Sequence, residues 1–227
     1  FKNRVHAVTD SVPYRYPLVV FDLDGTLVDS AGDIAEALNR TLDDWSLPRV
    51  PEATVLGWIG DGVRRLVEQA CDAAGRQVDL DTVMPGFMVH YTECLLRSPR
   101  LFDGVAEALQ VLRTRNVPLA ICTNKPVALV APLLQHLGLG GVLAQVLGGD
   151  SLPQRKPDGE PLRHLARAFG LQPGQCLMVG DSLTDYRAAQ DAGMPVALVR
   201  YGYPRGLDLE HANAVAVLDD LRELPGL

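Results

Sequence analysis

Two aspartates, Asp22 and Asp24, stand two residues apart directly after the apolar run Pro17–Phe21. Gly25 follows them and permits a tight turn where the run ends. Carboxylates this close repel each other unless a cation or a shared proton offsets their charge, and hard oxygen ligands of this kind suit Mg²⁺. The alternative is a plain polar turn, but few turns place two acids directly after such an apolar run. The spacing therefore predicts a Mg²⁺ site at the end of a strand.

A second polar cluster, Thr123-Asn124-Lys125, follows the apolar run 118–122. A hydroxyl, an amide and the free N–H groups of the next helix can bind a phosphate, although the same residues also make an ordinary helix cap. Lys156 lies in a loop, where a lysine is often simply solvated. The chain has only three lysines against eighteen arginines, however. The two internal lysines, Lys125 and Lys156, are therefore candidates to bind phosphate or to neutralise an aspartate.

A further pair of acids, Asp181 and Asp185, follows the apolar run 175–179 and lies one helical turn apart. A simple helix cap is again the alternative for Asp181. The clusters together supply carboxylates, a hydroxyl and a lysine. Phosphoryl transfer needs this set, because one carboxylate attacks, another moves protons, and the cations offset the charge on the transferred group.

Strands and helices that alternate along the chain must position these groups. Short apolar runs predict buried parallel strands, and helical patterns between them predict a sheet covered on both faces. The strands are expected at 17–21, 118–122, 145–147, 175–179 and 195–199, and the helices at 126–137, 160–169 and 184–192. Asp103 is expected to cap another helix. We therefore predict an α/β fold with a Rossmann-like parallel sheet.

The segment 33–97 interrupts this alternation, because it has helical patterns at 34–45, 62–74 and 82–96 and no clear strand. It leaves the sheet at the edge where such folds bind ligands, so we expect an all-helical cap domain that acts as a lid. Within it, Gly60, Gly62 and Arg64 form a turn and helix start that could meet an anionic substrate, or only join two helices. The predicted domains are a leader (1–16), a catalytic core (17–32 and 98–227) and the cap (33–97).

Composition limits the partners. The net charge is −7 with no basic run, which argues against nucleic acid, and no apolar stretch is long enough to span a membrane. The four cysteines form no metal-ligand spacing and fit a reducing cytoplasm. We expect a cytoplasmic monomer or homodimer that acts on a small anionic phosphate ester.

The segments VVFDLDGTLVDS, ICTNKP, RKPD and MVGDSLTD resemble the four motifs of the haloacid dehalogenase superfamily, in the same order. The resemblance implies an aspartyl-phosphate intermediate on Asp22 and an acid–base role for Asp24. It also implies that Thr123 binds the phosphoryl group together with Asn124, and that Lys156 steadies that group and the nucleophile. Finally, it implies Mg²⁺ ligands at Asp22, Asp24 (through its backbone carbonyl) and Asp181. Asp185 supports them.

Within this superfamily, TNKP, GGDSLPQRKPD and YGYPRG most resemble the bacterial phosphoglycolate phosphatases. One departure is Asp158-Gly159-Glu160, where a proline usually comes sooner after the lysine–proline pair. Dehalogenases lack the second acid, and phosphonate-cleaving members need a cap lysine that this cap does not have. Another phosphate ester or pyrophosphate as substrate, a sugar-phosphate mutase, and a catalytically silent binding protein stay open as alternatives.

Overall fold

Six parallel strands form the central sheet in the computed structural model, which describes residues 14–227. Their order across the sheet is β5-β4-β1-β6-β7-β8, so β1, which ends at the DxD pair, lies in the interior of the sheet. The strands are β1 (Val19–Phe21), β4 (Leu119–Cys122), β5 (Gln145–Leu147), β6 (Leu177–Gly180), β7 (Val196–Val199) and β8 (Ala216–Leu218). The first five occur where the sequence predicts them. The edge strand β8 was not predicted.

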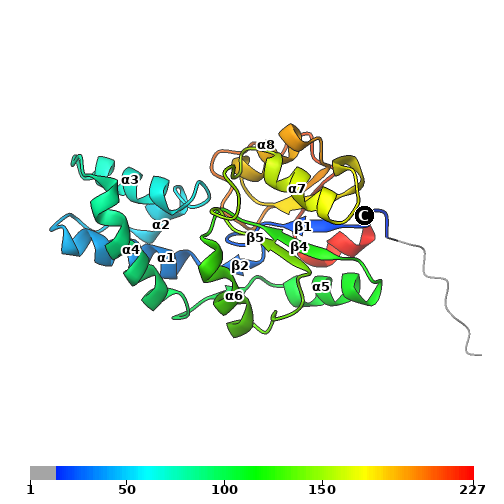
Figure 1. Cartoon of the computed structure of the whole chain (residues 1–227), viewed down its shortest axis with the longest axis horizontal. Coiled ribbons are helices and arrows are strands. Elements are labelled where there is room, and N and C mark those ends of the chain that lie inside the picture. Colours follow the sequence, from blue (N-terminus) through cyan, green and yellow to red (C-terminus); the bar gives the residue numbers. More distant parts are fainter. Residues whose placement is uncertain (1–13) are drawn as a thin grey trace, which may run out of the picture.

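Helices cover both faces of this sheet, as Figure 1 shows. The side chains of β1 alternate between the faces, with Val20 packed in one hydrophobic cluster and Val19 and Phe21 in the other. On the Val20 side lie α7 (Glu160–Ala168) and α8 (Leu183–Ala192), and on the other side lie α5 (Val105–Thr114), α6 (Val127–His136) and the 3₁₀ helix η2 (Leu221–Gly226). A second 3₁₀ turn, η1 (Pro173–Gln175), leads into β6. The predicted α/β fold is confirmed.

One predicted cap is wrong. Helix α5 is capped by Gly104, not by Asp103. Gly104 has a φ of +80°, in the left-handed region that favours glycine, and a side chain there would collide with Asp220. Gly104 is therefore required by its backbone conformation and by the lack of room for a side chain beside Asp220. A prediction based on capping side chains cannot detect either requirement.

Four helices form the cap, which lies beside the sheet domain in Figure 1. They are α1 (Ala31–Asp44), α2 (Glu52–Leu56), α3 (Val63–Ala73) and α4 (Leu80–Cys94). The short helix α2 was not predicted. The cap is joined to the core through an antiparallel two-stranded ribbon, β2 (Val28–Asp29) and β3 (Arg100–Leu101). Because the two segments that connect core and cap pair with each other in this ribbon, they fix the place from which the cap extends.

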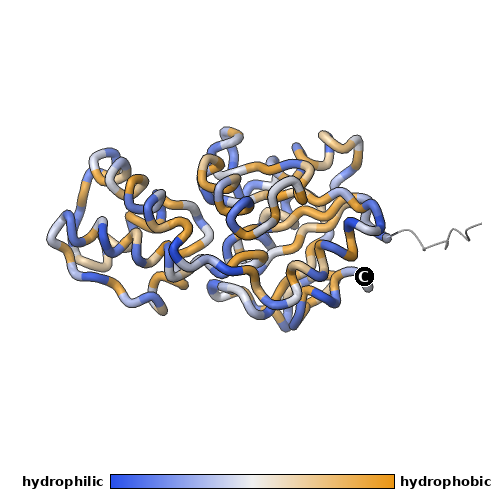
Figure 2. The backbone as a smooth tube through the Cα atoms, turned by 90° about the horizontal axis from the view of Figure 1, so that it is seen from below, coloured by the Kyte–Doolittle hydropathy of each residue, from blue (hydrophilic) through white to orange (hydrophobic). Residues whose placement is uncertain are grey.

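The apolar interior continues from the sheet into the cap. In Figure 2, apolar segments follow the strands and recur on the helices of the cap. The long helices α1 and α4 pack on each other through buried residues that include Leu38, Leu42 and Phe87. Of the predicted leader, residues 1–13 lie outside the described part, while Tyr16 is buried in the core cluster. Within residues 14–227, no helix is both long and apolar enough to cross a bilayer.

Candidate active site

The loop after β1 carries the two aspartates to the C-terminal edge of the sheet. Asp22 is buried and follows Phe21 directly, and the chain then turns at Gly25, which has a φ of +93°. A side chain at position 25 would overlap the carboxylate of Asp181. Gly25 is therefore required both by its backbone conformation and by the neighbouring acid.

Lys156 connects two of the buried carboxylates. Its ammonium Nζ lies 2.8 Å from Asp22 Oδ1 and 2.6 Å from Asp185 Oδ1, and its side chain is 2% exposed. Burial lowers the pKa of Lys156, but the Asp185 and Asp22 carboxylates together raise it by more than burial lowers it. The pKa of Lys156 is therefore raised overall. Lys156 is therefore a fixed positive charge beside Asp22, and not a solvated loop lysine.

Asp185 is held by the start of helix α8. Its Oδ2 accepts hydrogen bonds from the Ser182 hydroxyl (2.7 Å) and the Ser182 backbone N–H (3.1 Å), while its Oδ1 faces Lys156. In return, Ser182 caps the helix by accepting from the Asp185 N–H. The capping box thus orients a carboxylate toward the site.

Asp181 follows β6 and completes a group of three acids. Its carboxylate accepts from the Thr26 hydroxyl at 2.6 Å and from the Tyr203 N–H at 2.7 Å. One carboxylate oxygen each from Asp22, Asp181 and Asp185 lies within 4.8 Å of the others, and all three residues are buried. These three residues could hold a divalent cation.

The acid cluster carries more negative charge than its surroundings balance. Burial, followed by the Asp185 charge, raises the pKa of Asp22 from 3.8 to about 7, even though Lys156 opposes the shift. Burial and the same neighbour raise the pKa of Asp181 well above its ordinary value. When all three carboxylates are ionised, the one ammonium leaves two negative charges, which a divalent cation would neutralise.

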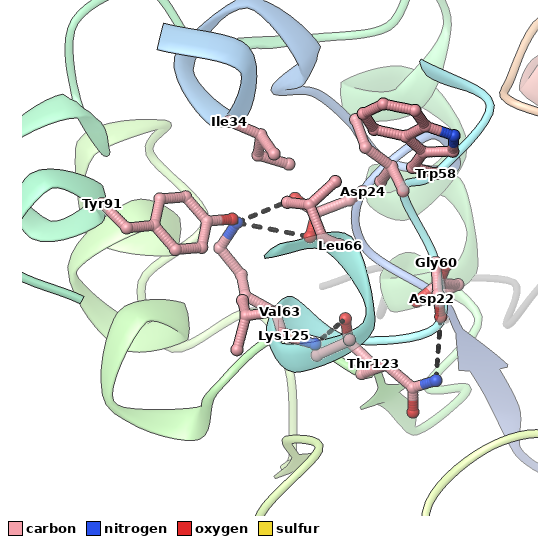
Figure 3. Close-up of a pocket in the computed structure, with 13 residues that line it drawn as sticks. Asp22, Asp24, Ile34, Trp58, Gly60, Val63, Leu66, Tyr91, Thr123 and Lys125 are labelled. Atoms are coloured by element: carbon pink, nitrogen blue, oxygen red, sulfur yellow. Dashed lines mark hydrogen bonds and ion pairs between the residues drawn. The ribbon is translucent and has the colours of Figure 1, made fainter. Parts of the chain in front are cut away.

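Asp24 faces a different set of partners. Its Oδ1 accepts from the Ser30 hydroxyl at 2.6 Å and lies 2.9 Å from Lys125 Nζ. Lys125 in turn donates a short hydrogen bond to the hydroxyl of Tyr91, which belongs to helix α4 of the cap. Figure 3 shows Tyr91 and Asp24 meeting at the end of the Lys125 side chain. The two acids of the DxD pair therefore serve separate networks.

Thr123 and Asn124 lie where the sequence predicts them, after β4. The Thr123 hydroxyl accepts from the Lys125 N–H at 3.2 Å and faces the pocket. The amide nitrogen of Asn124 donates to the carbonyls of Lys156 and Gly60, each at 2.8 Å. Asn124 thus ties the loop of Lys156 to the cap, while its buried Oδ1 has no hydrogen-bond partner among the described residues.

The turn Gly60-Asp61-Gly62 of the cap docks on the core. Asp61 accepts from the Thr184 hydroxyl at 2.7 Å and forms a short ion pair with Arg205. We call Asp61, Thr184 and Arg205 the cap–core latch. Arg205 also donates to the Gly57 carbonyl at 3.3 Å, and it lowers the pKa of Asp61 through their hydrogen bond. The latch holds the cap over the sheet edge.

A pocket of about 40 Å³ lies between the cap and the core. On the core side it meets Asp22, Asp24 and the loop after β4. On the cap side it is mostly apolar, with Ile34, Trp58, Ile59, Val63 and Leu66 beside Gly60, Gly62 and Tyr91. The structure does not bring Arg64 to this pocket. Its side chain is half exposed and pairs with Asp81 at 2.7 Å.

Sequence reasoning missed several residues of the site. Ser30 and Arg205 lie in the quoted segments VVFDLDGTLVDS and YGYPRG, but no role was predicted for either, and Tyr91 carried no local signal. Lys125 did carry one, since it is one of only three lysines in the chain. The scarcity of lysine pointed correctly to a position in the site, although it did not show which acid Lys125 would meet.

Comparison with known proteins identifies the class. Residues 16–193 match the family model of the haloacid dehalogenase-like hydrolases. The chain therefore belongs to the haloacid dehalogenase-like hydrolase family, which confirms the resemblance seen in its four motifs, and it is an enzyme.

Individual proteins of this family are similar to the chain over most of its length. The chain is 44% identical over 211 residues to the phosphoglycolate phosphatase (plasmid) of Cupriavidus necator, covering 92% of this chain and 91% of that protein. It is 41% identical over 213 residues to the phosphoglycolate phosphatase of Rhodospirillum rubrum, covering 91% and 88%. A crystal structure described as a predicted phosphoglycolate phosphatase from Haemophilus somnus superposes with a TM-score of 0.86 at 36% identity, covering 92% and 96%.

Proposed function

We propose that this enzyme is a Mg²⁺-dependent phosphomonoester hydrolase whose substrate is 2-phosphoglycolate and whose nucleophile is Asp22. The observation that carries the proposal is the position of Asp22. It is buried beside Lys156, within 4.8 Å of two further carboxylates, and at the wall of a pocket that also contains Asp24. A nucleophile, an acid–base group and charge compensation thus meet at one place.

The acid cluster fits a resident Mg²⁺. The ion would be held by the carboxylates of Asp22 and Asp181 and by the backbone carbonyl of Asp24, with Asp185 in support. The fit rests on the excess of two negative charges and on the raised pKa of both Asp22 and Asp181. When bound, Mg²⁺ would neutralise charge on the phosphoryl oxygens and orient them.

The residues of the chain would carry the reaction in two displacements. In the first, a carboxylate oxygen of Asp22 attacks phosphorus, the bond from phosphorus to the ester oxygen breaks, and Asp24 gives that oxygen its proton. In the second, Asp24 takes a proton from water, the water oxygen attacks phosphorus, and the bond to Asp22 breaks to release inorganic phosphate. Lys156 and the Thr123 hydroxyl would hold the phosphoryl group throughout.

Two observations support 2-phosphoglycolate as the substrate. The relatives that carry this name match over nearly the whole chain, at up to 44% identity. The pocket is small and is bounded by the cap on one side, which suits a compact ester better than a sugar phosphate. Gly60 and Gly62 line it and would let a substrate approach the cap backbone.

A panel of phosphate esters tests the proposal with the wild-type enzyme and Mg²⁺. We expect the highest kcat/KM for 2-phosphoglycolate among esters that include sugar phosphates, glycerol phosphate and pyrophosphate, and loss of turnover after chelation of the metal. If no ester is hydrolysed in the presence of Mg²⁺, the phosphatase assignment is wrong. If another ester ranks well above 2-phosphoglycolate, only the substrate assignment is wrong.

We also propose that the enzyme acts in the cytoplasm. All four cysteines are buried and free of disulfides, which suits a reducing compartment. Cell fractionation of the native host would test this, and recovery of the protein from an extracytoplasmic fraction would contradict it.

A further inference from the structure

Lys125 is the one positively charged side chain among the thirteen residues that line the pocket. Its side chain is only 1% exposed, and the two-displacement reaction leaves it without a task. Its ammonium forms an ion pair with Asp24, with Nζ 2.9 Å from Asp24 Oδ1. Asp24 is its one acidic partner within residues 14–227, so a second negative charge, brought by a ligand, would further stabilise this buried cation.

The position of Lys125 relative to Asp24 defines where that negative charge would lie. Asp24 must reach the ester oxygen of the substrate in order to protonate it. In 2-phosphoglycolate, the carbon bonded to this oxygen also bears the carboxylate. The carboxylate therefore lies within a few bonds of the atom that Asp24 contacts, and Lys125 Nζ lies only 2.9 Å from Asp24 Oδ1.

Tyr91 adds a second donor at the same place. Lys125 donates its short hydrogen bond to the Tyr91 oxygen, which leaves the hydroxyl hydrogen of Tyr91 available to another acceptor. The ring also lies beside the ammonium, with its centroid 4.7 Å from Nζ. Since Tyr91 belongs to cap helix α4 and Lys125 to the core, this pair of donors exists only when the cap is closed.

The other cap groups offer no comparable site for an anion. The remaining cap side chains of the pocket carry no charge, and Arg64 is paired with Asp81 at the surface. Lys156 is already shared by Asp22 and Asp185. Lys125 and Tyr91 are thus the donors best placed for a second negative group on the substrate.

We propose that Lys125, together with the Tyr91 hydroxyl, binds the carboxylate of the substrate and so selects carboxylate-bearing phosphate esters. This inference rests on the proposed function and adds to it the residues that recognise the leaving group. Asp24 keeps its second partner, Ser30, when Lys125 turns to the substrate. Closure of the cap and recognition of the carboxylate are then one event, because the two donors come from the two domains.

Two substrates that differ only in the carboxylate test this assignment: 2-phosphoglycolate and ethyl phosphate. The readout is the ratio of their kcat/KM values. In Lys125→Met we expect this ratio to fall by about 100-fold, as for loss of a buried charge partner, and in Tyr91→Phe by about fivefold. Arg113→Met, which removes an exposed charge on α5, serves as the control and should leave the ratio unchanged.

The ratio separates recognition from a merely structural role. A Lys125 that only positions Asp24 or ties down the cap would lower both kcat/KM values alike, so an unchanged ratio in Lys125→Met overturns the inference. If the ratio of kcat/KM values fell in Arg64→Met and not in Lys125→Met, Arg64 would be the residue that binds the carboxylate. Should Lys125→Met fail to fold, as judged by circular dichroism, Tyr91→Phe decides, because an unchanged ratio there also overturns the assignment. Failure of the wild-type enzyme on both esters would instead count against the proposed function.

Discussion

The two walls of the pocket are built from different chemistry. The core wall carries the buried carboxylate of Asp22 at a strand end. Behind it, Lys156 lies between Asp22 and Asp185, which is held by the cap of helix α8. The cap wall is mainly apolar, and the polar contacts of the cap with the core include the latch at Asp61, the carbonyls of Gly57 and Gly60, and the Tyr91 hydroxyl. The contrast indicates that the core performs the reaction, while the cap excludes water and selects the substrate.

The largest effect should come from the nucleophile on the core wall. Asp22→Asn keeps the shape of the side chain but removes the charge that attacks, so we expect kcat to fall on the order of 10⁴-fold or more. Steady-state turnover of p-nitrophenyl phosphate measures this, with circular dichroism as the check on folding. Appreciable residual turnover would show that another group attacks.

The acid–base residue should come next and should depend on the leaving group. In Asp24→Asn we expect loss of about 10²- to 10³-fold in kcat/KM for an alkyl ester, because its poor leaving group needs a proton. For p-nitrophenyl phosphate the first displacement should be much less affected, since that leaving group departs unprotonated. Equal losses for both esters in pre-steady-state kinetics would contradict a role for Asp24 as proton donor.

Metal binding should stabilise the core in a pH-dependent way. The pKa of Asp22 is raised from 3.8 to about 7 in the folded, metal-free protein. Between pH 3.8 and about 7, the folded state therefore binds more protons than the unfolded state. The contribution of Asp22 to the free energy of unfolding is fully present below about pH 4 and is lost as the pH rises through 7. Mg²⁺ binds the deprotonated acid cluster and so makes up for the stabilisation that deprotonation removes.

We therefore expect Mg²⁺ to raise the Tm little at pH 5 and clearly at pH 8, with about 2.7 kcal/mol of stabilisation when the ion is present at 100 times its Kd. Thermal unfolding at both pH values, with and without the ion, provides the measurement. Asp181→Asn should abolish the difference. A shift that is equal at the two pH values would show that the ion binds elsewhere.

The smallest effect should come from the cap–core latch. Asp61→Asn weakens a pair that is partly solvated, with Asp61 33% and Arg205 14% exposed, so we expect a cost of about 1 kcal/mol and a rise in KM of about fivefold. The value of kcat should stay within about twofold, because the core wall is intact. The matched control is Asp81→Asn, which removes an exposed cap carboxylate away from the pocket. A large fall in kcat would place the latch in the chemistry.

The core wall was far easier to predict from the sequence than the cap wall. Asp22 and Asp181 directly follow strands, Lys156 lies in the loop after β5, and parallel strands bring their ends to one edge of the sheet. The apolar runs therefore predicted the strands and, with them, the meeting of the acids. Edge strand β8 was not predicted, although it has the same length and burial pattern as β5, which was.

The contacts of the cap depend on how the cap and the core pack together. Tyr91 lies in the last turn of helix α4, and nothing in its neighbours along the chain indicates that its hydroxyl reaches Lys125. The same holds for Arg205, which is 144 residues from Asp61. Arg64 stood out in the sequence beside a glycine turn, yet the structure pairs it with Asp81, since the start of α3 directs it to the surface.

Direct detection of the phosphoryl group on the chain tests the central claim, that Asp22 on the core wall is the nucleophile. Asp24→Asn should form the phosphoenzyme from p-nitrophenyl phosphate and Mg²⁺ but break it down slowly, because water is no longer activated. Acid quenching and peptide mass spectrometry should then find one phosphoryl group on the peptide at Asp22, together with a stoichiometric burst of p-nitrophenolate. A burst without a phosphorylated peptide, or a phosphoryl group on any other residue, would contradict the account.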